Sequence, residues 1–290
     1  MIRPFVSVII PTLSRPECLA VVLQGLFHQT YENFEIIVVN QGEFPSPLKR
    51  RLVQMSSRHL HWIDDYRQGL ARARNTGFRK ASGEIVLGIE DDLIICRRTL
   101  VQKHAEAYRE PLVGGTTGSV IEAKHKNYRG HVGEIHPLLC VPIGQGYGTT
   151  RQYVQTIKGG NMSFRRNLLL DVGGFDERFG QPSIYEDTDI SLKVRRLGYK
   201  LLFLPEADVV HLSAPSGGER SDNDPRLFRF VAYRDRVLLF RNNYPIWRFP
   251  VFIGANLLSA LLPILRMEWR SVELALRGLM EGLRLFWLSR

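Results

Sequence analysis

The sequence has few cysteines, and none of them forms a pair at metal-binding spacing. Its 290 residues contain three, Cys18, Cys96 and Cys140, and there is no CxxC motif. This excludes a disulfide scaffold and a zinc finger, and isolated thiols are typical of a reducing compartment. The first residues also lack the apolar run of a secretory signal peptide, so the sequence predicts a cytoplasmic protein.

Internal repeats and low-complexity tracts are also absent from the sequence. Hydrophobic residues make up 44% and charged residues 23%, values typical of a globular protein with a sizeable core. This composition excludes a wholly disordered chain and a collagen-like one. The length allows one large domain or two modest ones.

Acidic residues are fewer than basic ones, and the imbalance is concentrated near the C-terminus. The net charge is +10, and residues 226–290 hold eleven arginines, no lysine and four acidic residues, a net charge of +7. A basic segment of this kind is compatible with binding to nucleic acid or anionic lipid, or with simple solvation. Its apolar content decides between these alternatives.

The first third of the chain alternates between strand-like and helix-like patterns. Short apolar runs rich in β-branched residues lie at 5–10, 34–39 and 84–89, and apolar residues recur at helical spacing in 15–29 and 70–81. Such alternation predicts βαβ units and therefore a parallel sheet with helices on both faces.

The middle of the chain has weaker patterns. The glycine-rich residues 113–158 are predicted to form strands and loops over the carboxyl edge of the sheet. Helical patterns at 165–171 and 186–197 are followed by two late strands, at 201–204 and 207–210.

The C-terminal quarter changes character. Residues 249–265 carry no charge, but they contain Pro250, Asn256 and Pro263 and fall short of the ~20 residues of a membrane-spanning helix. Residues 270–288 place apolar side chains on one helical face and several arginines beside it. This pattern fits a helix lying in a membrane interface and equally a helix packed on the protein's own core. The arginine surplus and the adjoining uncharged run lead us to favour the membrane surface.

Three adjacent carboxylates, Glu90, Asp91 and Asp92, directly follow the third predicted strand. Their mutual repulsion favours a bound cation, and ligands of open α/β sheets bind at the carboxyl ends of strands. Oxygen ligands select Mg²⁺ or Mn²⁺. The alternative is an acidic helix start, where carboxylates complement the helix dipole.

A second acidic group begins the predicted helix at 186–197. Glu186, Asp187 and Asp189 could simply cap that helix, or one of them could act as a general base. His211 follows Asp187 by 24 residues, enough chain for a helix and two strands to return to the same edge of the sheet. A single histidine after a strand can also be purely structural.

A series of segments follows in this order: 6–12, 29–30, 35–39, 69–77, 81–86, 90–92, 159–166, 173–177 and 186–191. In order and spacing these segments resemble family 2 glycosyltransferases, which have the GT-A fold. The resemblance runs from about Val6 to His211. It implies an α/β fold with a mostly parallel sheet, flanking helices and a C-terminal helical extension.

The resemblance also implies roles for individual residues. Asp187 would be the general base, with Glu186 beside it, and a Mn²⁺ or Mg²⁺ ion would be held by Asp92, Glu90 and His211. Glu90 stands where the family usually has Asp, and Asn40 where it usually has an acidic residue. The residues implied to bind the nucleotide sugar are Pro11, Thr12, Arg15, Asn40, Arg74, Asn75, Asp91, Gly160 and Asn161.

The implied activity is a metal-dependent transfer, with inversion, of a sugar from a nucleotide-diphosphate sugar to a hydroxyl of a glycan or lipid-linked glycan. We therefore predict a catalytic domain at 1–225 and a basic amphipathic helical extension at 226–290. The extension predicts peripheral association with an anionic membrane, at the inner face of the plasma membrane. The oligomeric state is left open.

Three other functions compete with this interpretation. A sugar nucleotidyltransferase of similar fold would need a glycine-rich phosphate loop after the first strand, and residues 11–16 contain no glycine. A nucleic-acid-binding protein would interleave its basic residues with aromatic stacking platforms, which this basic segment does not do, so we predict no nucleic-acid partner. A catalytically inactive binding protein remains the third alternative, although Asp92 and Asp187 are both present.

Overall fold

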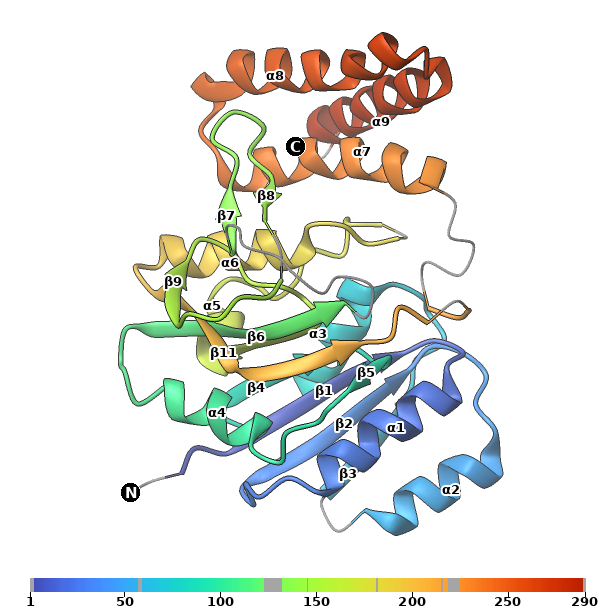
Figure 1. Ribbon diagram of the computed structural model, residues 1–290, viewed down its shortest axis with the longest axis vertical. Helices are drawn as coiled ribbons and strands as arrows, with labels where there is room; N and C mark the ends of the chain where they lie inside the picture. The colour runs from blue at the N-terminus through green and yellow to red at the C-terminus, as the bar shows by residue number, and fades with distance from the viewer. Residues whose placement is uncertain are drawn as a thin grey trace.

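A large mixed sheet lies at the centre of the molecule (Figure 1). The computed structural model describes residues 3–56, 59–122, 132–144, 146–180, 182–214, 216–218 and 225–288. Over these residues the strand order is β3-β2-β1-β4-β10-β6-β11-β5, with β9 beside β11. The strands are β1 (Val6–Thr12), β2 (Phe34–Asn40), β3 (His59–Asp64), β4 (Ile85–Ile89), β5 (Leu93–Ile94), β6 (Val113–Glu122), β9 (Gln152–Val154), β10 (Asn161–Arg165) and β11 (Lys200–His211).

The three strands predicted in the first third of the chain are confirmed. Strand β1 pairs in parallel with β2 on one side and with β4 on the other. All three are buried along their length because their runs of Val, Ile and Leu are covered on both faces. The sheet as a whole is mostly parallel, as predicted, but β10 runs antiparallel between β4 and β6.

Two predictions for the middle of the chain are wrong. Residues 113–122 form the buried strand β6 within the main sheet, whereas residues 113–158 were expected to form strands and loops over its carboxyl edge. Its glycines are required by close packing, since a side chain at Gly118 would come within 1.9 Å of the Ala207 carbonyl oxygen. The two predicted late strands are one strand, β11, whose pairing with β6 shifts by a bulge after Leu204.

Helices cover both faces of the sheet. One face carries α1 (Pro16–Phe27), α2 (Ser46–Met55) and α4 (Leu100–Ala107), and the other carries α3 (Leu70–Lys80), α5 (Arg166–Asp171) and α6 (Glu186–Arg196). Along β1 the side chains of Val6, Val8 and Ile10 enter the first core and that of Ile9 enters the second.

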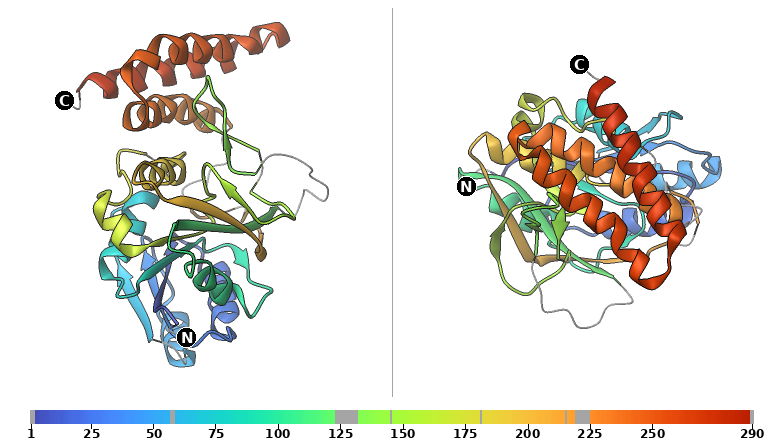
Figure 2. Two further views of the ribbon diagram at one scale, coloured as in Figure 1. Left: turned by 90° about the vertical axis from the view of Figure 1, so that its left-hand side faces the viewer. Right: turned by 90° about the horizontal axis from the view of Figure 1, so that it is seen from above.

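The remaining helices form a separate layer beyond α6 (Figure 2). They are α7 (Pro225–Asn243), η1 (Ile246–Arg248), α8 (Phe249–Leu261), η2 (Leu262–Arg266) and α9 (Trp269–Leu288). A hairpin of β7 (Glu134–Ile135) and β8 (Pro142–Ile143) reaches up to them, and Cys140 from its tip is buried among their side chains. We call residues 226–290 the C-terminal extension.

The prediction that the apolar face of 270–288 contacts a membrane is wrong. This face of α9 packs on α7, where Val272, Ala275 and Leu279 are buried. Helix α8 instead has an exposed apolar side. The continuous helical segment Ile246–Arg266 has 21 residues and is, by length and composition alone, long and apolar enough to cross a membrane. The uncharged run 249–265, taken by itself, was predicted to be too short for this.

Candidate functional site

The carboxyl ends of β1 and β4 bring the acidic triplet next to the first βα loop. A cavity of about 500 Å³ opens there, as expected for the edge of an α/β sheet. The predicted residues that line it are Pro11, Thr12, Arg15, Glu90, Asp91, Asp92 and His211. We call this space the first cavity.

Asp91 lies at the bottom of the first cavity and is fixed by two neighbours. The Thr12 hydroxyl donates a hydrogen bond of 2.7 Å to Asp91 Oδ2, and Arg15 Nη1 lies 3.2 Å from Oδ1. Burial raises the pKa of Asp91 to about 6 in spite of Arg15. Asp91 is therefore held in place to accept hydrogen bonds from a ligand in this cavity.

Glu90, Asp92 and His211 form a cluster suited to a divalent cation. One ligand atom of each lies within 4.8 Å of the others, and His211 Nε2 is 3.2 Å from Asp92 Oδ1 and 3.4 Å from Glu90 Oε2. Contact with Asp92 raises the pKa of His211 to about 9, although burial acts against it. Two carboxylates and an imidazole form a ligand set that fits Mn²⁺ or Mg²⁺.

Arg15 spans the two aspartates of the triplet. Its Nη1 lies 3.0 Å from Asp92 Oδ2, and its Nε donates a hydrogen bond of 3.0 Å to the Ser216 carbonyl. Burial raises the pKa of Asp92, but His211 and Arg15 outweigh it, so this pKa lies below its ordinary value. The buried carboxylates of Asp91 and Asp92 therefore need positive charge beside them to offset the loss of hydration.

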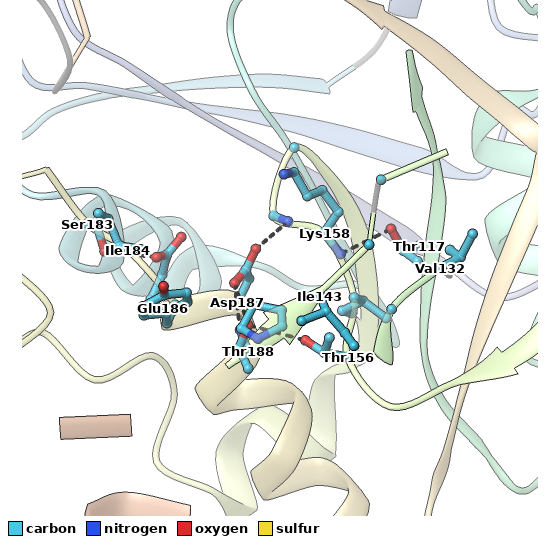
Figure 3. A pocket seen from close by; sticks show the side chains of 18 of the residues that line it. Thr117, Val132, Ile143, Thr156, Lys158, Ser183, Ile184, Glu186, Asp187 and Thr188 are labelled. Atoms are coloured by element: carbon cyan, nitrogen blue, oxygen red, sulfur yellow. Dashed lines mark hydrogen bonds between the residues drawn. The ribbon is translucent and has the colours of Figure 1, made fainter. Parts of the chain in front are cut away.

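A second cavity, of about 300 Å³, adjoins the first, and Leu70, Glu90 and Ser183 line both. It contains the side chain of Asp187, which points toward the loop carrying Lys158 (Figure 3). Asp187 Oδ2 accepts a hydrogen bond of 2.8 Å from the Gly159 amide. Burial, and then the charge of Glu186, raise the pKa of Asp187.

Glu186 faces inward, although it also lines the second cavity. Its carboxylate pairs with buried Arg74 and accepts a hydrogen bond of 3.0 Å from the Ser183 hydroxyl. Arg74 also donates to the Gly159 carbonyl, at 3.1 Å. Glu186 is therefore committed to a buried ion pair, whereas Asp187 accepts hydrogen bonds from the Gly159 amide and, at Oδ1, from the Thr188 amide and hydroxyl.

The structure places Asn40 behind the first cavity instead of in its wall. The Asn40 amide donates to Asp64 Oδ1 at 2.9 Å and to the Gly42 carbonyl at 2.7 Å. The next residue, Gln41, lines the first cavity. The end of β2 therefore reaches this cavity through Gln41.

Asn75 and Asn161 likewise lie outside both cavities, whereas Gly160 lines the second one. Asn75 exchanges hydrogen bonds with the backbone of Phe175, and Asn161 donates to the Ala207 carbonyl at 2.7 Å. Both amides join chain segments that are distant in sequence. Their geometry is that of residues that support the site.

Two charged residues that line the cavities were missed by sequence reasoning. Glu122, at the end of β6, lines the first cavity and lies 3.4 Å from His211 Nδ1. Lys158 lines the second cavity beside Asp187. The position of Lys158 immediately before the segment 159–166 could have identified it from the sequence. Glu122 could not be identified in this way, because only the pairing of β6 with β11 places it beside His211.

Comparison with family models gives two matches. Residues 7–173 match the model described as Glycosyl transferase family 2, which covers more than half of the chain. Residues 145–267 match the model described as Glycosyl transferase family group 2, which extends into the C-terminal helices.

Curated relatives are similar at 24–28% identity. The glucosyl-dolichyl phosphate glucuronosyltransferase of Haloferax volcanii is 28% identical over 184 residues, 61% of this chain and 57% of that protein. The poly-beta-1,6-N-acetyl-D-glucosamine synthase of Staphylococcus aureus is 24% identical over 186 residues, 64% of this chain and 44% of that protein. The chain thus spans about half the length of these relatives.

Two solved structures share the fold. The mannosyltransferase PcManGT of Pyrobaculum calidifontis, in complex with GDP-Man and Mn²⁺, has a TM-score of 0.61 at 17% identity and covers 100% of this chain and 89% of its own. Staphylococcus aureus TarS 1-349, in complex with UDP-GlcNAc, has a TM-score of 0.58 at 16% identity, with coverages of 99% and 93%.

Proposed function

The chain belongs to glycosyl transferase family 2 and has its GT-A fold, and from this premise we propose that it transfers a sugar from a nucleotide-diphosphate sugar to an acceptor hydroxyl. The observation that carries the proposal is the adjacency of the two cavities. A cluster of side chains that could hold a cation lies in one, the half-buried carboxylate of Asp187 lies in the other, and Glu90 borders both.

The first cavity is the proposed site for the nucleotide sugar. Asp91 and Thr12 offer polar groups for the nucleoside, and Arg15 offers positive charge for the phosphates. Mn²⁺ or Mg²⁺, held by Glu90, Asp92 and His211, would neutralise the diphosphate and make it a better leaving group. In support, two solved structures of this fold hold GDP-Man with Mn²⁺ and UDP-GlcNAc.

The second cavity is the proposed site for the acceptor, with Asp187 as the general base. Its raised pKa brings it closer to neutrality, which suits a base that must take a proton from a hydroxyl. Glu186 is held by Arg74 and Ser183 and is the weaker candidate. A hydroxyl deprotonated by Asp187 attacks the anomeric carbon opposite the leaving diphosphate, so direct displacement inverts that carbon.

The acceptor in this proposal is a lipid-linked glycan, and the extension holds the enzyme on the inner face of the plasma membrane. The outer side of the α8 layer exposes Trp247 (76%), Leu258 (65%) and Leu265 (84%), side chains that a lipid interface would cover. Arg266 is exposed at one end of this apolar side, where it could pair with anionic headgroups, while Arg248 at the other end donates to the Pro137 carbonyl at 2.7 Å. The proposed surface is thus that of α8, with α9 beneath it.

The test is a panel of nucleotide sugars offered with and without Mn²⁺. We expect one of them to raise the melting temperature only when Mn²⁺ is present, and to release nucleoside diphosphate when an acceptor is added. The Asp187→Asn variant serves as the control that binds but does not turn over. Release of pyrophosphate from a nucleoside triphosphate and a sugar phosphate would instead identify a nucleotidyltransferase. Failure to bind any nucleotide sugar would contradict the proposal.

A further inference from the structure

The residue immediately before helix α6 has a strained backbone. Tyr185, two positions before Asp187, has φ 73° and ψ 8°, the left-handed conformation that non-glycine residues rarely adopt. Such a conformation is strained and persists only where the surrounding structure enforces it. The position of the proposed base therefore depends on what surrounds Tyr185.

Helix α7 supplies much of those surroundings. Tyr185 packs against two buried clusters, one of which contains Leu238 and Leu239 and the other Val231 and Ala232. All four of these side chains belong to α7 and are buried. The turn before Asp187 is therefore braced by the C-terminal extension as well as by the catalytic domain.

Polar contacts fix α7 to the same part of α6. Asp189, which follows Asp187 by half a helical turn, is fully buried. Its Oδ1 accepts hydrogen bonds from Asn243 Nδ2 at 2.6 Å and Asn242 Nδ2 at 3.0 Å, while Lys193 lies 2.7 Å from Oδ2. A buried carboxylate needs such partners, so α6 and α7 are held in one relative position.

From these contacts we propose that α7 positions the general base, with Tyr185 and Asn243 as positioning residues for Asp187. The inference rests on the proposed function, because it assigns a role in that reaction to the extension. A displacement of the base by 1 Å can reduce the rate about 100-fold, so a brace of this kind affects turnover directly. The extension is then part of the catalytic apparatus as well as an anchor.

The test compares Asn243→Ala with Arg229→Ala. Arg229 is a matched control because it also lies on α7, but it donates to the Ser271 carbonyl of α9, whereas Asn243 donates to Asp189 of α6. We expect Asn243→Ala to lower kcat for transfer by about 10–100-fold with unchanged Mn²⁺-dependent affinity for the nucleotide sugar. Amide hydrogen exchange at residues 184–188 should also become faster. Arg229→Ala should leave both quantities at the parent values.

Unchanged kcat and unchanged exchange in Asn243→Ala would overturn the inference, as would equal effects in Arg229→Ala. If Asn243→Ala does not fold, Asn243→Gln keeps the amide on a longer arm, and the same pair of measurements applies to it. The rate of amide hydrogen exchange at residues 184–188 tests whether α7 braces this turn, and it does so without a measurement of sugar transfer. A parent protein that transfers no sugar, with exchange still faster in the variant, would reject the proposed function alone and leave α7 as the brace of this turn.

Discussion

Three groups contact the carboxylate of Asp92. Arg15 and His211 contact its carboxylate, and the Ala214 amide donates to Oδ2 at 3.1 Å. We expect Asp92→Asn to abolish Mn²⁺-dependent nucleotide-sugar binding while the fold is kept, because a hard cation loses a charged oxygen ligand. His211→Ala should weaken metal binding less, by about 10–100-fold. Calorimetry with Mn²⁺ measures both, and unchanged affinity in Asp92→Asn would remove this residue from the metal site.

Asp187 gives a second prediction at the scale of single residues. Asp187→Asn should bind nucleotide sugar normally and lose transfer by about 10²–10⁴-fold, the usual contribution of a general base. Glu186→Gln is the contrasting variant, because its carboxylate holds Arg74 and its loss should lower the melting temperature. Initial rates at saturating nucleotide sugar separate the two effects. Transfer at the parent rate by Asp187→Asn would make this residue structural.

The direction of each side chain explains which site residues the sequence could predict. Glu90, Asp92 and Asp187 carry a charge pattern and a position after a strand or at a helix start, and they do line the cavities. Asn40 and Asn161 lie at the end and the start of strands, where the pleat decides which face a side chain takes. Their neighbours Gln41 and Gly160 line the cavities in their place.

At the scale of elements, the loop between α5 and α6 is tied to α7 through the carboxylate of Asp176. Arg178 Nε donates to Asp176 Oδ1 at 2.9 Å, and Asn242 Nδ2 donates to Oδ2 at 2.8 Å. Burial raises the pKa of Asp176, but Arg178 and Asn242 outweigh it and lower the pKa to about 2. A lowered pKa stabilises the folded state above the ordinary pKa of Asp, and this contribution is lost as the pH falls toward 2.

Asp176→Asn should therefore reduce the free energy of unfolding at pH 7 by about 1–2 kcal/mol, since Arg178 is partly exposed and its charge is screened. The difference from the parent should disappear as the pH approaches 2. Asp208→Asn is the control, because it breaks a more exposed ion pair with Arg97 and should cost about 0–1 kcal/mol. Denaturant unfolding across this pH range measures both, and a pH-independent loss in Asp176→Asn would contradict the linkage.

Elements with continuous apolar runs could be predicted from the sequence. Elements whose position depends on the neighbouring strand or helix could not. Strands β1, β2 and β4 are buried on both faces, so their sequences are apolar throughout. Strand β6 owes its place to glycines that let β10 and β11 approach, a requirement invisible before the pairing is known. The face of α9 was visible in the sequence, but α7, which covers it, is apolar on two faces, one packed on α9 and one on the segment before α6, so no single stripe stands out.

For the whole molecule, the membrane proposal predicts flotation with anionic liposomes that is partly reversed by salt, because each Arg near the surface adds about 1 kcal/mol of screened attraction. The double variant Leu258→Glu, Leu265→Glu should stay at the bottom of the gradient, since it places charge on the outer side of α8. Leu112→Glu changes another exposed leucine, at 52%, in the turn before β6, so it is the control and should float. A parent protein that does not float would contradict the proposal.

The order of the helix layers sets a minimum distance between the outer side of α8 and Asp187. The second cavity is lined by Phe228 of α7, and the outer side of α8 faces away from it across the helix layer. Packed helices lie roughly 8–10 Å apart, so a hydroxyl at headgroup level would stop at least that far short of Asp187. On the proposed membrane surface, the extension would therefore set a minimum reach for the acceptor. Only acceptors whose hydroxyl stands about one helix spacing or more above the lipid would reach Asp187, and shorter ones would not, whatever their chemistry.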